Sequence, residues 1–366
     1  MVNKYSSGGG QNTSNKLKQN PLFKDINDYN KYLLSLVGIL FLVITGVISY
    51  NLTNASYAKW SSSVESKNII KLSVKSETPA LKFAQANVGK NGLEQITHEI
   101  DNTLQVDNEF ATEYRYRGGD SVVKNYVTFN NETWRIIGVI PTEDTSGNIE
   151  NRFKIIRDTS IGNMKWNKTQ DTTTNSYNNW VTGTLNTYLN NDYYNTLSND
   201  AKSIIGTTKY YLGGYSNSKI TSDTMWQYER KKANDTSGTY YSPYGTNPIM
   251  QNDASKKIAI MYASDYGYGA SKECISILDK YDGYSSCKTP NNWLDKSENT
   301  WFLSQCSSNS SFAFFVYSTG FVSSYGIDVN GNGYEYATRP VLSLSSNVKI
   351  SGGTGTSTDP YTLSLQ

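Results

Sequence analysis

The sequence predicts an α+β domain behind an N-terminal transmembrane helix. One segment, residues 32–50, is apolar and carries no charged residue. From residue 109 onward, short runs rich in β-branched and aromatic residues stand on both sides of two short amphipathic segments. Strands, two early helices and then mostly strands with long loops are typical of the α+β class.

The apolar segment reads YLLSLVGILFLVITGVISY, and as a helix it spans roughly the 30 Å hydrocarbon core of a bilayer. Four lysines lie within about twenty residues before it, and two lie within the same distance after it. This bias predicts a single-pass anchor with a cytoplasmic N-terminus and an exported C-terminal domain. A cleaved signal peptide, cut after Ser56, Tyr57 and Ala58, is the rival interpretation, although the run is long and far from residue 1. A buried core helix is the third interpretation of this segment.

The flanking segments are less apolar. Residues 1–31 are polar and predict a disordered cytoplasmic tail, whereas residues 51–108 predict a stalk or entry segment. Within that segment four apolar residues share one helical face: Leu93, Ile96, Ile100 and Leu104. His98 lies off this face, so we expect it to be solvated.

Composition restricts the class of partner. The 34 lysines and arginines nearly balance the 32 acidic residues, so the chain lacks the strongly basic charge that is typical of nucleic-acid-binding proteins. Tyrosine outnumbers phenylalanine by 29 to 11, and Asn, Ser and Thr are abundant. Such surfaces suit recognition, because tyrosine gives a large contact area at low entropic cost. A codon bias toward Asn, Tyr, Lys and Ile explains the same composition.

The chain has three cysteines. Cys274 and Cys287 flank a short loop, and outside the membrane they are free to form a disulfide, worth roughly 3 kcal/mol in the chain-entropy model. Cys306 is then left over and is expected to be buried. A zinc site is disfavoured, because there is no CxxC pair and His98 is the single histidine.

The elements of the domain 109–366 follow from its short runs. Residues 126–129 and 133–137 are β-rich, and the Asn-Asn-Glu between them predicts a hairpin turn. Helices are predicted near 180–189 and 193–205. Further strands are predicted at 153–157, 258–262, 301–304, 312–317, 320–323 and 339–344. A long loop, 264–296, and a turn-dense stretch, 351–361, complete the domain.

Several stretches carry a resemblance to a known family: YRYRG (114–118), NYVTFNNETWRIIGV (125–139), IAIMYASDYGYG (258–269) and RPVLSLSSNVKISGGTGTSTDPYTL (339–363). In this order the domain resembles an uncharacterised family of exported C-type-lectin-like domains from low-GC Gram-positive bacteria. The resemblance implies two helices on a small antiparallel sheet, with long loops forming a ligand face. The formylglycine-generating enzymes and phage tropism receptors are similar in overall fold. The family's Trp-x-Leu-x-Pro pattern departs here to end in Gln305.

Catalytic motifs are missing from the sequence. There is no GxSxG, no HExxH and no P-loop, and His98 precedes the domain. A formylglycine-type oxidase needs reactive paired cysteines, but Cys274 and Cys287 are better explained as a structural bridge. Carboxylate pairs such as Asp279 and Asp282 could serve a glycosidase, but nothing in their spacing supports that role, and a solvated loop explains them better.

One string resembles the start of a calcium loop. Asp328, Asn330 and Asn332 alternate with small residues, as in D-x-N-x-N-G. The twelfth position is Arg339 rather than the glutamate that calcium loops place there, and an Asn-Gly hairpin turn explains the same residues. The Glu-Pro-Asn and Gln-Pro-Asp triplets of calcium-dependent lectins do not occur.

The remaining candidates are loop residues that suit stacking on a sugar ring or anchoring a protein partner. They are Asp265, Tyr266, Tyr268, Trp293, Tyr325, Tyr334 and Tyr336. By contrast, Trp134, Trp180 and Trp301 are expected in the core, and Arg339 is expected to bond to nearby carbonyls or a carboxylate.

The sequence therefore predicts a membrane-anchored surface protein whose exported domain binds a glycan, a cell-wall polymer or a protein. A formylglycine-generating-like or hydrolytic enzyme is one alternative, and a structural envelope subunit is another.

Overall fold

The computed structural model describes Leu36, Val37, Leu40 and residues 77–169, 177–216, 220–232, 250–326 and 333–366. The chain divides into two compact units, Met1–Glu77 and Thr78–Gln366. Apart from three helical positions, the predicted tail 1–31 and transmembrane segment 32–50 lie outside the described residues. Among the residues described, no helix has the length and apolar character needed to cross a membrane.

The second unit is α+β, as predicted, and its larger sheet is antiparallel. Its strands are β1 (Leu93–Thr97), β2 (Thr112–Tyr116), β4 (Glu132–Glu143), β5 (Ile149–Arg157) and β13 (Val341–Ser343), in the order β1-β2-β4-β5-β13. β3 (Tyr126–Phe129) pairs with β4 through the predicted hairpin. Asn130 and Asn131 turn it at φ of 53° and 57°, a left-handed conformation that asparagine tolerates well.

The smaller sheet mixes strands from distant parts of the chain. Its order is β11 (Val322–Gly326), β10 (Phe312–Val316), β9 (Thr300–Gln305), β12 (Glu335–Ala337) and β6 (Asn163–Lys165). Only the β12–β9 pair is parallel. Two further pairs are β14 (Val348–Gly352) with β15 (Thr362–Leu365), and β7 (Tyr210–Tyr211) with β8 (Met250–Gln251).

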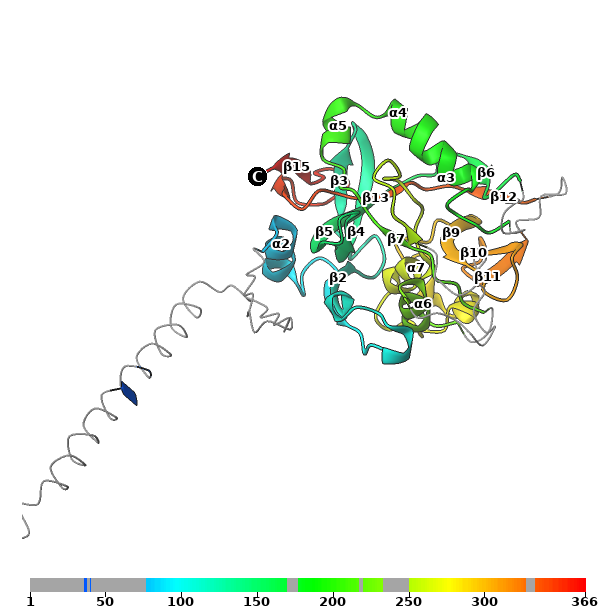
Figure 1. Ribbon diagram of the computed structural model, residues 1–366, viewed down its shortest axis with the longest axis horizontal. Coiled ribbons are helices and arrows are strands. Elements are labelled where there is room, and N and C mark those ends of the chain that lie inside the picture. Colours follow the sequence, from blue (N-terminus) through cyan, green and yellow to red (C-terminus); the bar gives the residue numbers. More distant parts are fainter. Residues whose placement is uncertain are drawn as a thin grey trace, which may run out of the picture. The chain divides into compact units, whose positions relative to one another are not determined.

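The helices are short and several begin with a side-chain cap. They are α2 (Pro79–Asn87), α3 (Thr184–Tyr188), α4 (Tyr194–Thr196), α5 (Asn199–Ser203), α6 (Ser222–Glu229) and α7 (Ala263–Gly269), with a π-helical turn at Leu189–Tyr193. Thr78, Ser198 and Thr221 accept backbone N–H bonds at the starts of α2, α5 and α6. Both predicted helical regions are therefore confirmed. In Figure 1, α3 and α4 lie along one side of the unit, and α6 and α7 lie together.

One large core joins both sheets. Trp134, Trp180 and Trp301 are at most 1% exposed, which confirms their predicted place. A second, smaller apolar cluster is separate from this core. It consists of Leu104, Val106, Phe110, Tyr211 and Trp226.

Three sequence predictions about local structure are wrong. Residues 93–97 form β1, not a helix, because their backbone pairs with β2 in the register Leu93↔Tyr116. The second compact unit begins at Thr78, so residues 78–108 of the predicted stalk or entry segment belong to it, whereas residues 51–76 lie outside the described residues. Residues 258–262 make one isolated bridge, Ala259↔Val341, and the chain then enters α7 where a loop was expected.

Candidate functional site

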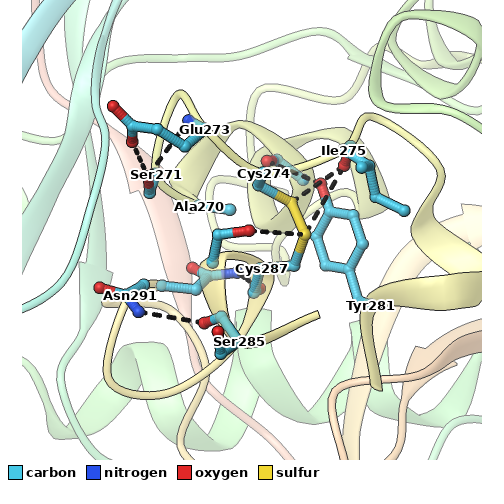
Figure 2. The surroundings of a disulfide bond; sticks show 12 residues. Ala270, Ser271, Glu273, Cys274, Ile275, Tyr281, Ser285, Cys287 and Asn291 are labelled. Atoms are coloured by element: carbon cyan, nitrogen blue, oxygen red, sulfur yellow. Dashed lines mark hydrogen bonds between the residues drawn. A yellow bond between two sulfur atoms is a disulfide. The ribbon is translucent and has the colours of Figure 1, made fainter. Parts of the chain in front are cut away.

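The predicted disulfide is present. Cys274 and Cys287 are bonded, and Cys306 is free and buried, as expected. The loop between the two bonded cysteines is structural: Tyr281 is buried, and its hydroxyl donates to the Gly267 carbonyl of α7. Figure 2 shows Tyr281 beside the bridge. The disulfide closes the loop, and the Tyr281 hydrogen bond holds the loop against α7.

Asp265 does not lie on an exposed ligand face. It is buried in the first turn of α7, where its Oδ2 accepts from the Tyr262 backbone N–H at 2.9 Å. Its carboxylate also accepts from Arg115 Nη1 at 2.7 Å and from Lys154 Nζ at 2.6 Å. Burial opposes its ionisation, but the Lys154 and Arg115 charges outweigh this and lower the pKa of Asp265 to about 2. Asp265 thus ties α7 to β2 and β5.

His98 is buried, so the expectation that it is solvated is wrong. Its Nε2 lies 3.0 Å from Glu113 Oε1, and its Nδ1 lies 3.0 Å from Asp223 Oδ1. The ring stacks on Trp226 with centroids 3.6 Å apart and planes 8° apart. Two carboxylates satisfy the buried ring, which explains why a polar residue can lie here. His98 fastens the segment after β1 to the start of α6.

Glu229, at the end of α6, was not identified from the sequence. Its carboxylate accepts from the backbone N–H and hydroxyl of Ser264 and from the Ser304 hydroxyl. Burial raises the pKa of Glu229 to about 7, despite the opposing Arg230 charge and serine hydrogen bonds. All three side chains are buried, so this group presents no exposed nucleophile. We interpret it as structural.

Two of the predicted loop aromatics are buried. Tyr266 packs against Tyr281 and Phe302, and Trp293 donates its Nε1–H to the Tyr116 carbonyl at 2.8 Å. Tyr268 is partly buried, with its ring edge-on to His98. The expected exposure of Tyr266 and Trp293 is wrong, because the loop 264–296 folds back over the core instead of projecting from it.

A second set of aromatic residues lies on the smaller sheet, and three of its five members are at least partly exposed. We call it the aromatic row; its members are Tyr334, Tyr336, Phe315, Tyr317 and Phe321. The rings of Tyr334 and Tyr336 are stacked, with their centroids 5.6 Å apart and an angle of 24° between their planes. The ring centroid of Phe315 lies 4.6 Å from that of Tyr336 and 4.5 Å from that of Tyr317. The centroids of Tyr317 and Phe321 are 5.7 Å apart. The row thus runs from β12 across the sheet to the turn between β10 and β11.

The row is anchored below and accessible at its ends. Tyr336 also contacts Trp301 of β9, with ring centroids 4.5 Å apart, and both rings are buried. Tyr334 is 46% exposed, and Tyr317 and Phe321 are partly exposed. Of the predicted site residues, the structure brings Tyr334 and Tyr336 together here.

The other predicted site residues are not all described. Tyr325 lies in β11 opposite Ala313, and its side chain is outside the described part. The calcium candidates Asp328, Asn330 and Asn332 also lie outside the described residues. Within residues that are described, His, Cys, Asp and Glu form no group of three or more suited to a metal ion.

Arg339 is buried and donates to the carbonyls of Arg157 and Leu294 at 3.0 and 3.1 Å, as expected. It therefore fixes the chain just before β13.

Comparison with known proteins gives no match to a family model, a curated protein or a solved structure.

Proposed function

We propose that this chain is a single-pass membrane protein whose exported domain binds a ligand at the cell surface. The uncharged segment 32–50 and the excess of lysines before it support this topology. The Cys274–Cys287 bond also supports it, because disulfides persist mainly in oxidising compartments. The ligand is a glycan, a cell-wall polymer or a protein.

A C-type-lectin-like fold is part of the proposal. Its support is the order of family-like stretches in residues 109–366 together with the α+β architecture, in which few helices accompany antiparallel and mixed sheets. Residues 78–108 add β1 and α2 in front of this region.

The aromatic row is the observation that carries the binding function. Tyr334 is 46% exposed, and its ring is stacked on the buried Tyr336, so part of an aromatic side chain that is held in place reaches solvent. Little side-chain freedom remains to be lost on binding, which favours affinity. The buried Glu229 and serine pair offers no comparable access for a substrate.

Two measurements test this proposal on the full-length chain. External protease on intact cells should digest the domain while a cytoplasmic marker survives; a domain that resists while another surface protein is cut would refute the topology. Purified full-length protein in detergent should bind isolated Gram-positive envelopes saturably. Tyr334→Ala should weaken that binding, and Tyr284→Ala, at a comparably exposed tyrosine outside the row, should not.

A further inference from the structure

His98 is a buried ring with a carboxylate on each side. Its Nε2 lies 3.0 Å from Glu113 Oε1, its Nδ1 lies 3.0 Å from Asp223 Oδ1, and the chain has no other histidine. An ionised carboxylate only accepts hydrogen bonds, so each ring nitrogen has to donate one. A neutral imidazole has one N–H, whereas an imidazolium has two. Both contacts are therefore satisfied only when the ring is protonated on both nitrogens.

Both carboxylates are held in their ionised form. Burial opposes the ionisation of Glu113, but the Arg115 charge and the His98 contact outweigh this and hold the pKa of Glu113 well below its usual range. Burial also opposes the ionisation of Asp223, but hydrogen bonds from His98 and Gln227 outweigh it and lower the pKa of Asp223. Of the side-chain types that meet at this ring, only histidine ordinarily changes its charge between about pH 5 and about pH 8.

The two carboxylates differ in how easily they can leave the ring. The Glu113 side chain is 1% exposed and also accepts hydrogen bonds from Arg115, so it is fixed. The Asp223 side chain is 50% exposed, so solvent can replace the ring as its partner. The Tyr268 hydroxyl of α7 lies 3.5 Å from the same Nδ1 and can donate to that nitrogen once it has lost its proton. Loss of the ring proton therefore breaks the contact with Asp223 rather than the one with Glu113.

The other charged groups near the ring either bind different partners or are exposed. They are Arg115, Arg117, Arg230, Glu99 and Asp101. Arg115 shares the acceptor Glu113 Oε1 with His98, so its positive charge opposes the ring proton that the two carboxylates favour. The ring proton is thus held by a balance of charges in direct contact.

Asp223 connects this proton to the docking of the segment after β1. Its Oδ2 accepts from Gln227 Nε2 at 2.9 Å. Gln227 in turn donates to the Glu99 carbonyl at 3.0 Å and accepts from the Asp101 N–H at 2.8 Å. An Asp223 side chain that turns to solvent therefore withdraws both His98 and a partner of Gln227 from the contact between this segment and α6.

From this geometry we infer that the contact between His98 and Asp223 is a proton-dependent latch, which fastens residues 98–104 to α6. The latch is closed while both ring nitrogens carry a proton. It opens on the Asp223 side when Nδ1 loses its proton, and Glu113 keeps the remaining N–H. Residues 98–104 are therefore held more firmly in acidic than in alkaline surroundings.

Nuclear magnetic resonance and hydrogen exchange on the full-length chain in detergent test the latch together. Because His98 is the single histidine, one ¹³Cε1 signal of labelled histidine reports the ring proton from about pH 5 to about pH 9. We expect the exchange protection of residues 98–104, corrected for the intrinsic pH dependence of exchange, to fall about tenfold as the ring loses its proton. This is the effect of losing one hydrogen bond to a charged group. Protection in β10 is the internal reference.

Asp223→Asn separates the latch from other titrations. Asparagine can accept from a protonated Nδ1 or, with its amide turned, donate to an unprotonated one, so the contact survives in both states. The variant keeps Glu229, which ends α6 and has a pKa of about 7, so any fall that remains in the variant belongs to other groups. Asp282→Asn, at an exposed aspartate outside the latch, should behave as wild type.

The expected result is a fall in protection that follows the ring signal in wild type and is about tenfold smaller in Asp223→Asn. An equal fall in the two proteins would overturn the inference. So would constant protection in wild type while the ring titrates, or a ring that keeps one protonation state across the whole range.

Discussion

Replacing Glu229 with glutamine should change how the stability of this protein depends on pH. The carboxylate of Glu229 is buried with Ser264 and Ser304 as its hydrogen-bond donors, and burial raises its pKa to about 7. Glutamine has the same shape and no charge. Its carbonyl can accept from one serine while its amide donates to the other, so Glu229→Gln keeps the packing and removes the titration.

The magnitude follows from linkage. An unperturbed glutamate has a pKa of 4.5, whereas folded Glu229 has one of about 7. Because the folded state binds this proton more tightly, the contribution to stability is fully present below pH 4.5 and is lost as pH rises through 7. The difference between the two values corresponds to about 3 kcal/mol of unfolding free energy.

Denaturant unfolding of the full-length chain in detergent, followed by tryptophan fluorescence from about pH 4.5 to about pH 8, measures this effect. Relative to wild type, Glu229→Gln should gain stability steadily across that range, by about 3 kcal/mol. Glu335→Gln, at an exposed carboxylate, is the matched control for the substitution itself. A constant difference between wild type and Glu229→Gln at every pH would refute the reasoning.

Three other substitutions test the framework around the site. Replacing Cys274 and Cys287 together with serine should lower the unfolding free energy by roughly 3 kcal/mol while envelope binding persists; abolished oxidation of a peptide at normal stability would instead support an enzyme. Asp265→Ala removes the carboxylate that pairs with buried Lys154 and one of the two that pair with buried Arg115, and should cost about 3–5 kcal/mol, against a near-neutral effect for exposed Asp282→Ala; equal effects would contradict the ion network. Gly138→Ala places a methyl group 2.1 Å from the Tyr114 carbonyl and should lower the melting temperature; an unchanged value would contradict the β2–β4 packing.

Local sequence signals predicted the elements that depend on neighbouring residues. The Asn130–Asn131 pair specified the hairpin because both adopt left-handed backbone conformations. The spacing of Cys274 and Cys287 specified a short bridge. The strand runs around Trp301 and Phe315 were recognised from their aromatic and β-branched content, and these two residues lie opposite each other in the sheet.

Features that depend on distant partners could not be predicted. His98 pairs with Asp223, which is 125 residues away, so the residues next to His98 in the sequence give no sign that it is buried. The stripe beginning at Leu93 fits a helix, but pairing with β2 decides the outcome. The start of α7 was missed because the segment contains two glycines, although Asp265 caps it. Burial of Trp293 likewise depends on a contact with Tyr116, 177 residues away.

The ratio of dissociation constants of Tyr334→Ala and Tyr334→Phe for isolated Gram-positive envelopes, measured with the full-length chain in detergent, tests the central claim most directly. The claim is that the aromatic ring at this position contacts the ligand at the cell surface. It predicts that the alanine variant binds about tenfold more weakly than the phenylalanine variant. Equal constants for the two variants would contradict it.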